Sequence, residues 1–308
     1  MVILVWSCKS AVKAQTVNHQ IDTLQIKETI VFLTSDKLLG RNTGTEGIET
    51  AATYVENSFK KNKIPPYFES YRDSFKIKDL DGYNIVGFIE GGDSKLKDEI
   101  IILGAHYDHI GVINPIENDS IANGANDNAS GVSVVLALAE YFAKERTNKR
   151  SLIISLFSGE EMGLVGSRYL ANRLKGANID LYTMFNFEMI GVPLKDRNYV
   201  AFATGYDTSN MPQVLNSYLE THFIGKSDVA TKYNLFKRSD NYPFYEAFQV
   251  PCQTISCCDL TNFDYYHHVD DEIDKLDFSF MGFFIDKMIP AIEKACNAPF
   301  KEIKITNE

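Results

Sequence analysis

The stretch that decides the fold is IIILGAHYDH at residues 100–109, followed by GANDNASG at 124–131 and LIISLFSGEE at 152–161. The first and third segments begin as runs of β-branched and other apolar residues, which predict buried strands. Between them, a glycine-rich turn leads into an apolar stretch at residues 131–141 that is typical of a helix. A strand, a helix and another strand in this order predict a parallel strand pair with a helix packed on it.

The same alternation runs through most of the chain. Further strand-like runs lie at residues 83–89, 184–187, 200–203 and 250–256, and helical patterns lie at 161–174, 211–219 and from about 278. This order predicts an α/β fold of three layers, in which helices cover both faces of a central, mixed but mostly parallel twisted sheet.

The segment before this alternation is helical in pattern. Residues 21–59 contain two helix-like patterns separated by a turn at residues 39–44, and Pro65 and Pro66 end the second pattern. No repeat, low-complexity linker or break in composition follows. We therefore expect a single domain at residues 21–308, preceded by a separate segment at residues 1–20.

The charge of the chain disfavours some classes of partner. Lys and Arg number 31 against 41 Asp and Glu, which gives a net charge of −10. Such a chain is not expected to bind nucleic acid or an anionic membrane surface as its main partner. Part of the negative charge is expected to belong to a site for divalent cations.

The chain opens with MVILVWSCKS, which is apolar up to Cys8 and then polar. This pattern resembles a cleaved export signal with a lipid-accepting cysteine, although no Lys or Arg precedes the apolar run. The run is far shorter than the roughly 20 residues of a membrane span. We expect an exported protein, periplasmic or anchored to a membrane through lipid on Cys8; a frayed apolar terminus is the alternative.

Four further cysteines fit neither a disulfide-dense scaffold nor the spacing of a zinc knuckle. They are Cys252, Cys257, Cys258 and Cys296. We expect free, buried thiols, with a bridge from Cys252 to Cys257 or Cys258 as the alternative.

Side chains of the types that bind metal ions follow the apolar runs and the glycine-rich turn. They are His106, Asp108, Asp127, Glu160, Glu161, Glu188 and His267. Because sites in parallel sheets gather at the carboxyl ends of the strands, we expect these side chains at one edge of the sheet. Imidazole nitrogen and carboxylate oxygen suit zinc, and two zinc ions need about this many ligands plus one free base. The pattern therefore indicates a two-metal hydrolase.

Some of these residues also have a simpler interpretation. Asp127 stands before a helix and could cap it. Glu160 and Glu161 could open the next helix, where the helix dipole favours negative charge. Asp108 lies two residues after His106 on an extended chain, so its carboxylate could orient the imidazole.

Six segments occur in the order and at the spacing of one known family. They are LLGRNTGTEG at residues 38–47, GAHYDH at 104–109, GANDNASG at 124–131, SGEEMG at 158–163, NFEMIG at 186–191 and YHHVDD at 266–271. On these segments, and over roughly residues 30–295, the chain resembles the co-catalytic zinc aminopeptidase and glutamate carboxypeptidase family, which includes bacterial leucyl aminopeptidases.

This resemblance implies a site with two zinc ions that share one carboxylate. The ligands would be His106, Asp127 and Glu188 for one ion, and Asp127, Glu161 and His267 for the other. Glu160 would act as general base and acid toward a water held between the ions, and Asp108 would orient His106. Tyr266 is a candidate hydrogen-bond donor to the tetrahedral oxyanion. The implied substrate is a peptide with a free N-terminus.

The chain departs from the family pattern at two places. Glu188 stands where the family has aspartate, so we expect the ion shared by His106 and Glu188 to be held more weakly or more selectively. Residues 239–241 read Ser-Asp-Asn, whereas the family often has histidine after Ser-Asp. His109 and His222 have no assigned partner, and we expect them to be surface or capping residues.

Three other functions remain as alternatives. A carboxypeptidase would need a basic residue for the substrate carboxylate, for which Arg168, Arg197, Lys237 and Arg238 are candidates. The glutaminyl-peptide cyclotransferases share the fold but use one zinc ion, so the presence of both His106 and Asp127 disfavours that reading. A receptor-like relative without metals is disfavoured because no ligand position is vacated.

Overall fold

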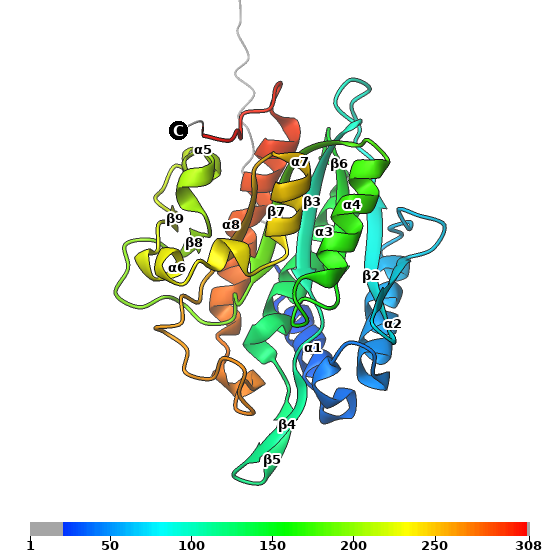
Figure 1. Cartoon of the computed structure of the whole chain (residues 1–308). Coiled ribbons are helices and arrows are strands. Elements are labelled where there is room, and N and C mark those ends of the chain that lie inside the picture. Colours follow the sequence, from blue (N-terminus) through cyan, green and yellow to red (C-terminus); the bar gives the residue numbers. More distant parts are fainter. Residues whose placement is uncertain (1–20, 307–308) are drawn as a thin grey trace, which may run out of the picture.

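The computed structural model describes residues 21–306, in which eight strands form one twisted sheet (Figure 1). Their order across the sheet is β1-β2-β6-β3-β7-β10-β8-β9. The strands are β1 (Arg72–Ile77), β2 (Leu80–Ile89), β3 (Glu99–His106), β6 (Ser151–Phe157), β7 (Asp180–Glu188), β8 (Ala201–Ala203), β9 (Ile224–Gly225) and β10 (Cys252–Ser256). A separate hairpin of β4 (Gly111–Ile116) and β5 (Asp119–Ala122) projects from the body of the molecule (Figure 1).

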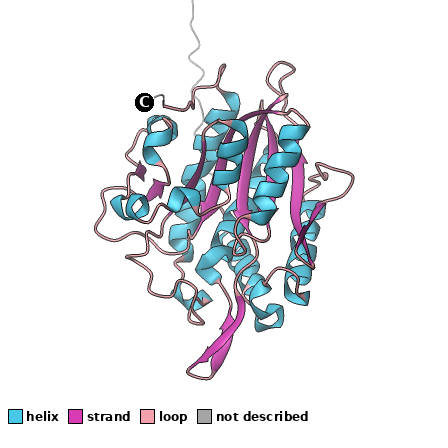
Figure 2. Cartoon of the chain, viewed as in Figure 1, coloured by secondary structure: helices cyan, strands magenta, loops and turns pink. Residues whose placement is uncertain are grey.

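Helices cover both faces of this sheet (Figure 2). One face carries α1 (Thr23–Leu33), α2 (Glu46–Lys61), α3 (Gly131–Glu145), α5 (Met211–Leu219) and α8 (Phe278–Asn297). The opposite face carries α4 (Val165–Gly176) and α7 (Asn241–Phe248), and the short α6 (Asp228–Lys232) lies beside β8 and β9 (Figure 1). The predicted three-layer α/β architecture is therefore confirmed.

The four central strands are parallel. β6, β3, β7 and β10 are consecutive neighbours in the sheet, and each adjacent pair runs in the same direction. Antiparallel strands flank them, β2 and β1 on one side and β8 on the other. The carboxyl ends of four neighbouring strands consequently meet at one edge, as predicted for the site.

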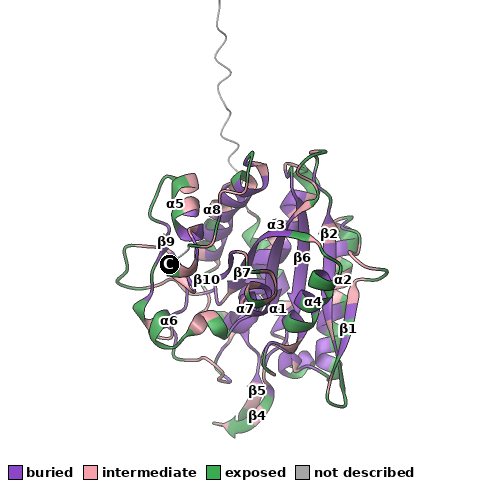
Figure 3. Cartoon of the chain, turned by 45° about the horizontal axis from the view of Figure 1, so that its top comes forward, coloured by how far each residue is buried: buried purple, intermediate pink, exposed green. Residues whose placement is uncertain are grey.

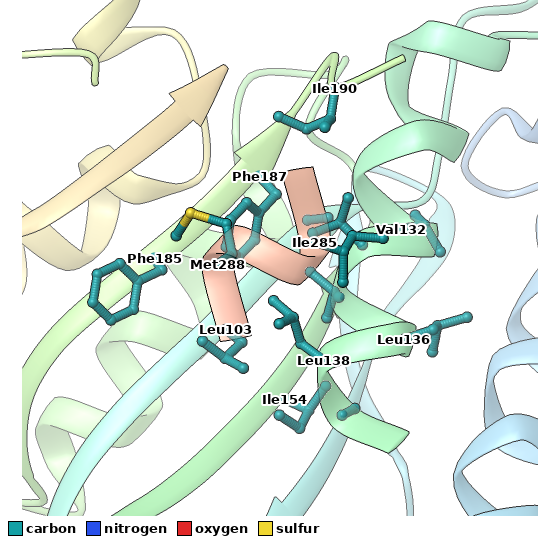
Figure 4. Packing of buried hydrophobic residues seen from close by; sticks show 14 of the residues in the cluster. Leu103, Val132, Leu136, Leu138, Ile154, Phe185, Phe187, Ile190, Ile285 and Met288 are labelled. Carbon is teal, nitrogen blue, oxygen red and sulfur yellow. The ribbon is translucent and has the colours of Figure 1, made fainter. Parts of the chain in front are cut away.

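Alternation along the strands divides the core into two parts. In β3, Leu103 belongs to the cluster under α3 and α8, whereas Ile102 belongs to the cluster under α4 and α7. Successive side chains of a strand point to opposite faces, which is why a continuous apolar run fills both layers. Figure 4 shows Leu103 and Phe187 among side chains of α3 and α8, and Figure 3 shows that the central strands are buried while the outer helix faces are exposed.

The helix after β6 begins later than the sequence suggests. We expected it from residue 161, but α4 starts at Val165. Gly163 and Leu164 have φ values of 98° and 61°, a left-handed conformation that an α-helix cannot contain. Residues 160–164 therefore form a turn, and the interpretation of Glu160 and Glu161 as helix-opening residues is wrong.

The expectation of free, buried thiols is confirmed. Cys252, Cys257, Cys258 and Cys296 are all buried and unbridged. Cys8 and the expected export signal lie outside the described residues. Across residues 21–306, no helix combines the length and the apolar character needed to cross a membrane.

One buried arginine ties together the segments that surround the sheet edge. Arg41 is fully buried in a turn, η1 (Asp36–Arg41), and its guanidinium donates hydrogen bonds to four backbone carbonyls. The acceptors are the carbonyl oxygens of Leu33, Tyr107, Asn123 and Gly124, at 2.5, 3.0, 2.6 and 3.0 Å. Burial lowers the pKa of Arg41 to about 10, against the effect of the nearby carboxylates of Asp271 and Asp127. The guanidinium thus joins the end of α1, the residues after β3 and the turn before α3.

Replacing this arginine should destabilise the whole fold. In Arg41→Met the side chain keeps its length but no longer donates to four buried carbonyls, of which Gly124 keeps the backbone N–H of Ala129 as a donor at 3.2 Å. We therefore expect a loss of about 3–5 kcal/mol in the free energy of unfolding, measured by urea denaturation. The control is Arg168→Ala, which removes an exposed ion pair with Glu246 and should cost at most about 1 kcal/mol. Equal stability of the two variants would contradict this role of Arg41.

Candidate metal centre

The candidate ligands come from the carboxyl ends of the four parallel strands. His106 is the last residue of β3, and Glu188 is the last residue of β7. Glu160 and Glu161 lie in the turn that follows β6, and His267 lies on the long loop after β10. Separate strands therefore deliver these side chains to one edge of the sheet, where the strand order brings them together.

Asp127 is supplied by the turn before α3 and is held by backbone contacts. This turn, η2 (Ala125–Ser130), donates from the backbone N–H groups of Asn126 and Asp127 to the carboxylate of Asp271, at 2.7 and 2.9 Å. The Asn128 amide donates to the carbonyl of Phe187 at 3.0 Å, which ties the turn to β7. Asp127 makes no capping hydrogen bond to α3, so its carboxylate is free to face the histidines.

Four side chains come together at one place, and Asp127 is one of them. The His109 Nδ1 and His267 Nε2 atoms each lie 3.0 Å from a carboxylate oxygen of Glu161, and His267 Nε2 lies 3.4 Å from Oδ2 of Asp127. One ligand atom from each of His109, Asp127, Glu161 and His267 lies within 4.8 Å of the others. In the described part of the chain, this group is the one that satisfies that spacing for a metal ion.

His106 contacts the second carboxylate oxygen of Asp127, the one that lies farther from His267. Its Nε2 atom lies 3.3 Å from Oδ1 of Asp127, whereas His267 is nearest to Oδ2. Its Nδ1 atom lies 3.1 Å from the backbone oxygen of Asp108 and 3.8 Å from the carboxylate. The imidazole is thus closer to the carbonyl of Asp108 than to the carboxylate that we expected to orient it.

The Asp108 carboxylate links other parts of the site instead. It accepts a hydrogen bond from the Thr43 hydroxyl at 3.1 Å and from the backbone N–H of Glu160 at 3.3 Å. The Thr43 hydroxyl in turn accepts from the backbone N–H of Gly159 at 2.9 Å. The motif at residues 38–47, to which the sequence assigned no chemical role, thus fixes the turn that carries Glu160 and Glu161.

Glu188 stands apart from the four-residue group. One of its carboxylate oxygens accepts a hydrogen bond from the Ser239 hydroxyl, which itself accepts from the Asn186 amide at 2.9 Å. Burial raises the pKa of Glu188 to about 7, although the His106 imidazole opposes the rise. The Glu188 carboxylate therefore interacts with the charge of His106, but its hydrogen-bond partner is Ser239.

Charge in the site is arranged to favour a cation. Burial would raise the pKa of Asp127, but the close imidazoles of His106 and His267 hold it below its usual range. Burial would lower the pKa of His267, but Asp127 and Glu161 raise it to about 10. The Nε2 atoms of His106 and His267 are buried without a well-formed hydrogen bond. Imidazole nitrogens and carboxylate oxygens in a site that favours positive charge are suitable ligands for zinc.

His109 lies inside the site rather than at the surface. It is fully buried and takes part in the four-residue group, so it is not the surface or capping residue that we expected. His222, by contrast, is exposed, as expected, and its ring lies against the ring of Tyr199. The feature of the sequence that could have indicated His109 as a site residue is its position three residues after His106, just beyond the end of a strand.

A small cavity opens beside Glu188 and Tyr266. Its volume is about 40 Å³, and it is lined by Phe202, Leu235 and Arg238 among others. The Tyr266 ring stacks on His267 at a centroid distance of 4.0 Å. Burial raises the pKa of Tyr266 above its usual range, so its hydroxyl keeps its proton and can donate a hydrogen bond.

Comparison with known proteins identifies relatives among zinc peptidases. The model of peptidase family M28 matches residues 84–291. A probable zinc metalloprotease of Pyrenophora tritici-repentis is 39% identical over 107 residues, 35% of this chain and 24% of that protein. The chain matches less than half the length of these curated relatives.

Solved structures share the fold. The LapA aminopeptidase of Legionella pneumophila is 20% identical with a TM-score of 0.69, covering 90% of this chain and 73% of that one. A glutaminyl cyclase of Porphyromonas gingivalis is 16% identical with a TM-score of 0.71, covering 89% and 99%. At these identities the likeness shows the common fold.

Asp240 gives a test of the electrostatics around the site. It is fully buried, and neither carboxylate oxygen makes a hydrogen bond of ordinary geometry in the described chain. Burial raises its pKa from 3.8 to about 7; Asp108 and Glu188 add to the rise, and His106 opposes it. A raised pKa means that the stability present below about pH 4 is lost as the pH rises to 7.

Asp240→Asn should remove this loss. In metal-free protein, the free energy of unfolding of the variant minus that of wild type should increase by roughly 2–3 kcal/mol from pH 5 to pH 8. Urea denaturation at the two pH values measures this increase. The control is Asp264→Asn at an exposed position, which should show no such difference. An effect of Asp240→Asn that is the same at both pH values would refute the assignment.

Proposed function

The chain belongs to peptidase family M28, and we propose on that basis that it is a zinc-dependent aminopeptidase, which removes residues from peptides with a free N-terminus. The observation that carries the proposal is the convergence of His109, Asp127, Glu161 and His267, with Glu160 beside them, at the edge where four parallel strands end. A metal site with a neighbouring unligated carboxylate is the arrangement that metal-assisted hydrolysis requires.

We propose two zinc ions, one on each side of Asp127. Asp127, Glu161 and His267 would hold one ion, and His106, Asp127 and Glu188 would hold the other. The approach of His106 and His267 to different oxygens of the Asp127 carboxylate supports a bridging role. Because Ser239 holds Glu188, the second ion should be the weaker of the two.

Glu160 is the proposed general base and acid. Burial raises its pKa well above the usual range, and the nearby Glu188 and Asp240 add to the rise while His106 opposes it. A carboxylate with a raised pKa can take a proton from the attacking water and return it to the leaving amine. Bound zinc would polarise the scissile carbonyl and make water a better nucleophile. Tyr266 would donate a hydrogen bond to the developing oxyanion.

Action at the N-terminus is favoured by the charges around the site. The side chains gathered around the site are mostly acidic, and negative charge attracts a substrate ammonium group rather than a carboxylate. Of the basic residues considered for a carboxypeptidase, Arg168 pairs with Glu246 and Arg197 pairs with Asp259. Arg238 is the one of those four that lines the cavity at the site.

A glutaminyl-peptide cyclotransferase is the second candidate. It is favoured by one observation, that the described residues gather a single compact ligand group, and the solved glutaminyl cyclase shares the fold. A peptide that begins with glutamine separates the two functions, because a cyclotransferase releases ammonia and keeps the peptide length, whereas an aminopeptidase releases glutamine.

Removing the proposed base should abolish hydrolysis without removing zinc. For Glu160→Gln we expect kcat for an aminoacyl anilide to fall by about 10²- to 10⁴-fold, because the amide cannot accept the proton. Zinc content, measured by elemental analysis, should stay at the wild-type value. The exposed Glu246→Gln is the control, and a kcat of Glu160→Gln within tenfold of wild type would show that another group is the base.

Blocking one end of the substrate decides between the two exopeptidase types. We expect free amino acid to be released from an unblocked peptide and from one with an amidated C-terminus, but not from an N-acetylated peptide. Arg238→Ala should change kcat/KM for the unblocked peptide by only a few fold. Release from the N-acetylated peptide, with strong dependence on Arg238, would instead indicate a carboxypeptidase.

A further inference from the structure

The position of His109 is fixed by the surrounding backbone. Its N–H group donates to the carbonyl of Arg41 at 3.3 Å, and its ring packs on Gly124. A Cβ atom at Gly124 would lie 2.6 Å from the Cδ2 atom of the ring, and Gly124 has a φ of +60°. A glycine is therefore needed for the imidazole to lie where it does, with its Nδ1 atom directed at Glu161.

The distances around His109 are those between ligands of a single ion. In a tetrahedral zinc site with bonds of about 2.0–2.1 Å, neighbouring ligand atoms lie roughly 3.3 Å apart. His109 Nδ1 lies 3.0 Å from Glu161 Oε1 and 3.8 Å from Asp127 Oδ2. His267 Nε2 lies 3.0 Å from the other oxygen of Glu161, Oε2, and 3.4 Å from the same Asp127 Oδ2. The two imidazoles thus stand in equivalent positions around the same two carboxylates.

A second observation is that one ring nitrogen of His109 has no hydrogen-bond partner within residues 21–306, while the other contacts Glu161 at 3.0 Å. Its ring is completely buried, and its Nε2 atom makes no hydrogen bond in the described residues. The Nδ1 atom has carboxylate oxygens as its near polar neighbours. A buried imidazole held against two carboxylates in this way is typical of a ligand.

We propose that the Nδ1 atom of His109 binds the same zinc ion as Asp127, Glu161 and His267, which gives that ion four protein ligands. This inference rests on the zinc site of the proposed function but not on the reaction. A closed set of four ligands is typical of a tightly held ion, whereas a catalytic ion keeps an open position. The His106 side of Asp127, where Ser239 holds Glu188, is then the side that receives substrate.

The alternative is that His109 only donates a hydrogen bond from Nδ1 to Glu161 and orients it. Loss of such a partner costs about 10- to 100-fold in metal affinity, so affinity alone does not separate the two roles. The number of imidazoles bound to the zinc ion separates them. If His109 is a ligand, the ion binds two imidazoles, those of His109 and His267; if His109 only orients Glu161, the ion binds one.

The experiment uses full-length protein in a His106→Ala background, loaded with one equivalent of zinc, so that the ion occupies the His109 side. X-ray absorption at the zinc edge counts the imidazoles, and competition with a chelator gives the affinity. The key variant is His109→Asn, whose amide N–H can replace the Nδ1 donor but cannot replace the nitrogen ligand. His222→Ala is the surface control, and matching unfolding curves in chelator show that each variant folds.

We expect two imidazoles in the parent protein and in His222→Ala, and one in His109→Asn, with an affinity loss of more than about 100-fold. His109→Ala should lose as much as His109→Asn. One imidazole in the parent protein, or an unchanged count in His109→Asn, would overturn the proposal. Zinc bound by two imidazoles in a protein that hydrolyses no peptide would leave this inference standing while the proposed function failed.

Discussion

Repulsion between buried carboxylates is the constraint on which this molecule depends. Six acidic side chains meet at the edge where the parallel strands end: Asp108, Asp127, Glu160, Glu161, Glu188 and Asp240. Burial raises the pKa of Glu160, Glu188 and Asp240, whereas contacts with imidazoles lower the pKa of Asp127 and Glu161. The two acids that contact imidazole nitrogens directly are thus kept ionised, whereas burial raises the pKa of the other four, including Asp108. A divalent cation offsets the first group and leaves Glu160 able to exchange a proton.

The fold resists this repulsion with contacts that lie outside the ligand set. Arg41 binds backbone carbonyls on both sides of the site, Thr43 connects the end of β3 to the turn after β6, and Asp271 holds the backbone of the Asp127 turn. These three residues fix the backbone, so that the ligands are aligned before an ion binds. Stability and metal binding are therefore coupled through the same loops, because a loosened turn also displaces a carboxylate.

Much of the fold and of the site could be predicted from the sequence, since both follow from periodicity and from the strand-end rule. The apolar run before His106 is buried on both faces, and α5 and α8 begin where their patterns begin, at Met211 and Phe278. The rest depends on how loops pack. The left-handed residues before α4, the carbonyl of Asp108 beside His106, and the burial of His109 arise from contacts between segments far apart in sequence. Periodicity carries no information about such contacts.

Anomalous diffraction at the zinc edge, from crystals of the protein loaded with zinc, tests the central claim most directly. The account predicts a strong peak between Asp127, Glu161 and His267, and a second, weaker peak on the His106 side of Asp127. The absence of any zinc peak at this edge of the sheet, with zinc bound elsewhere or not at all, would contradict it.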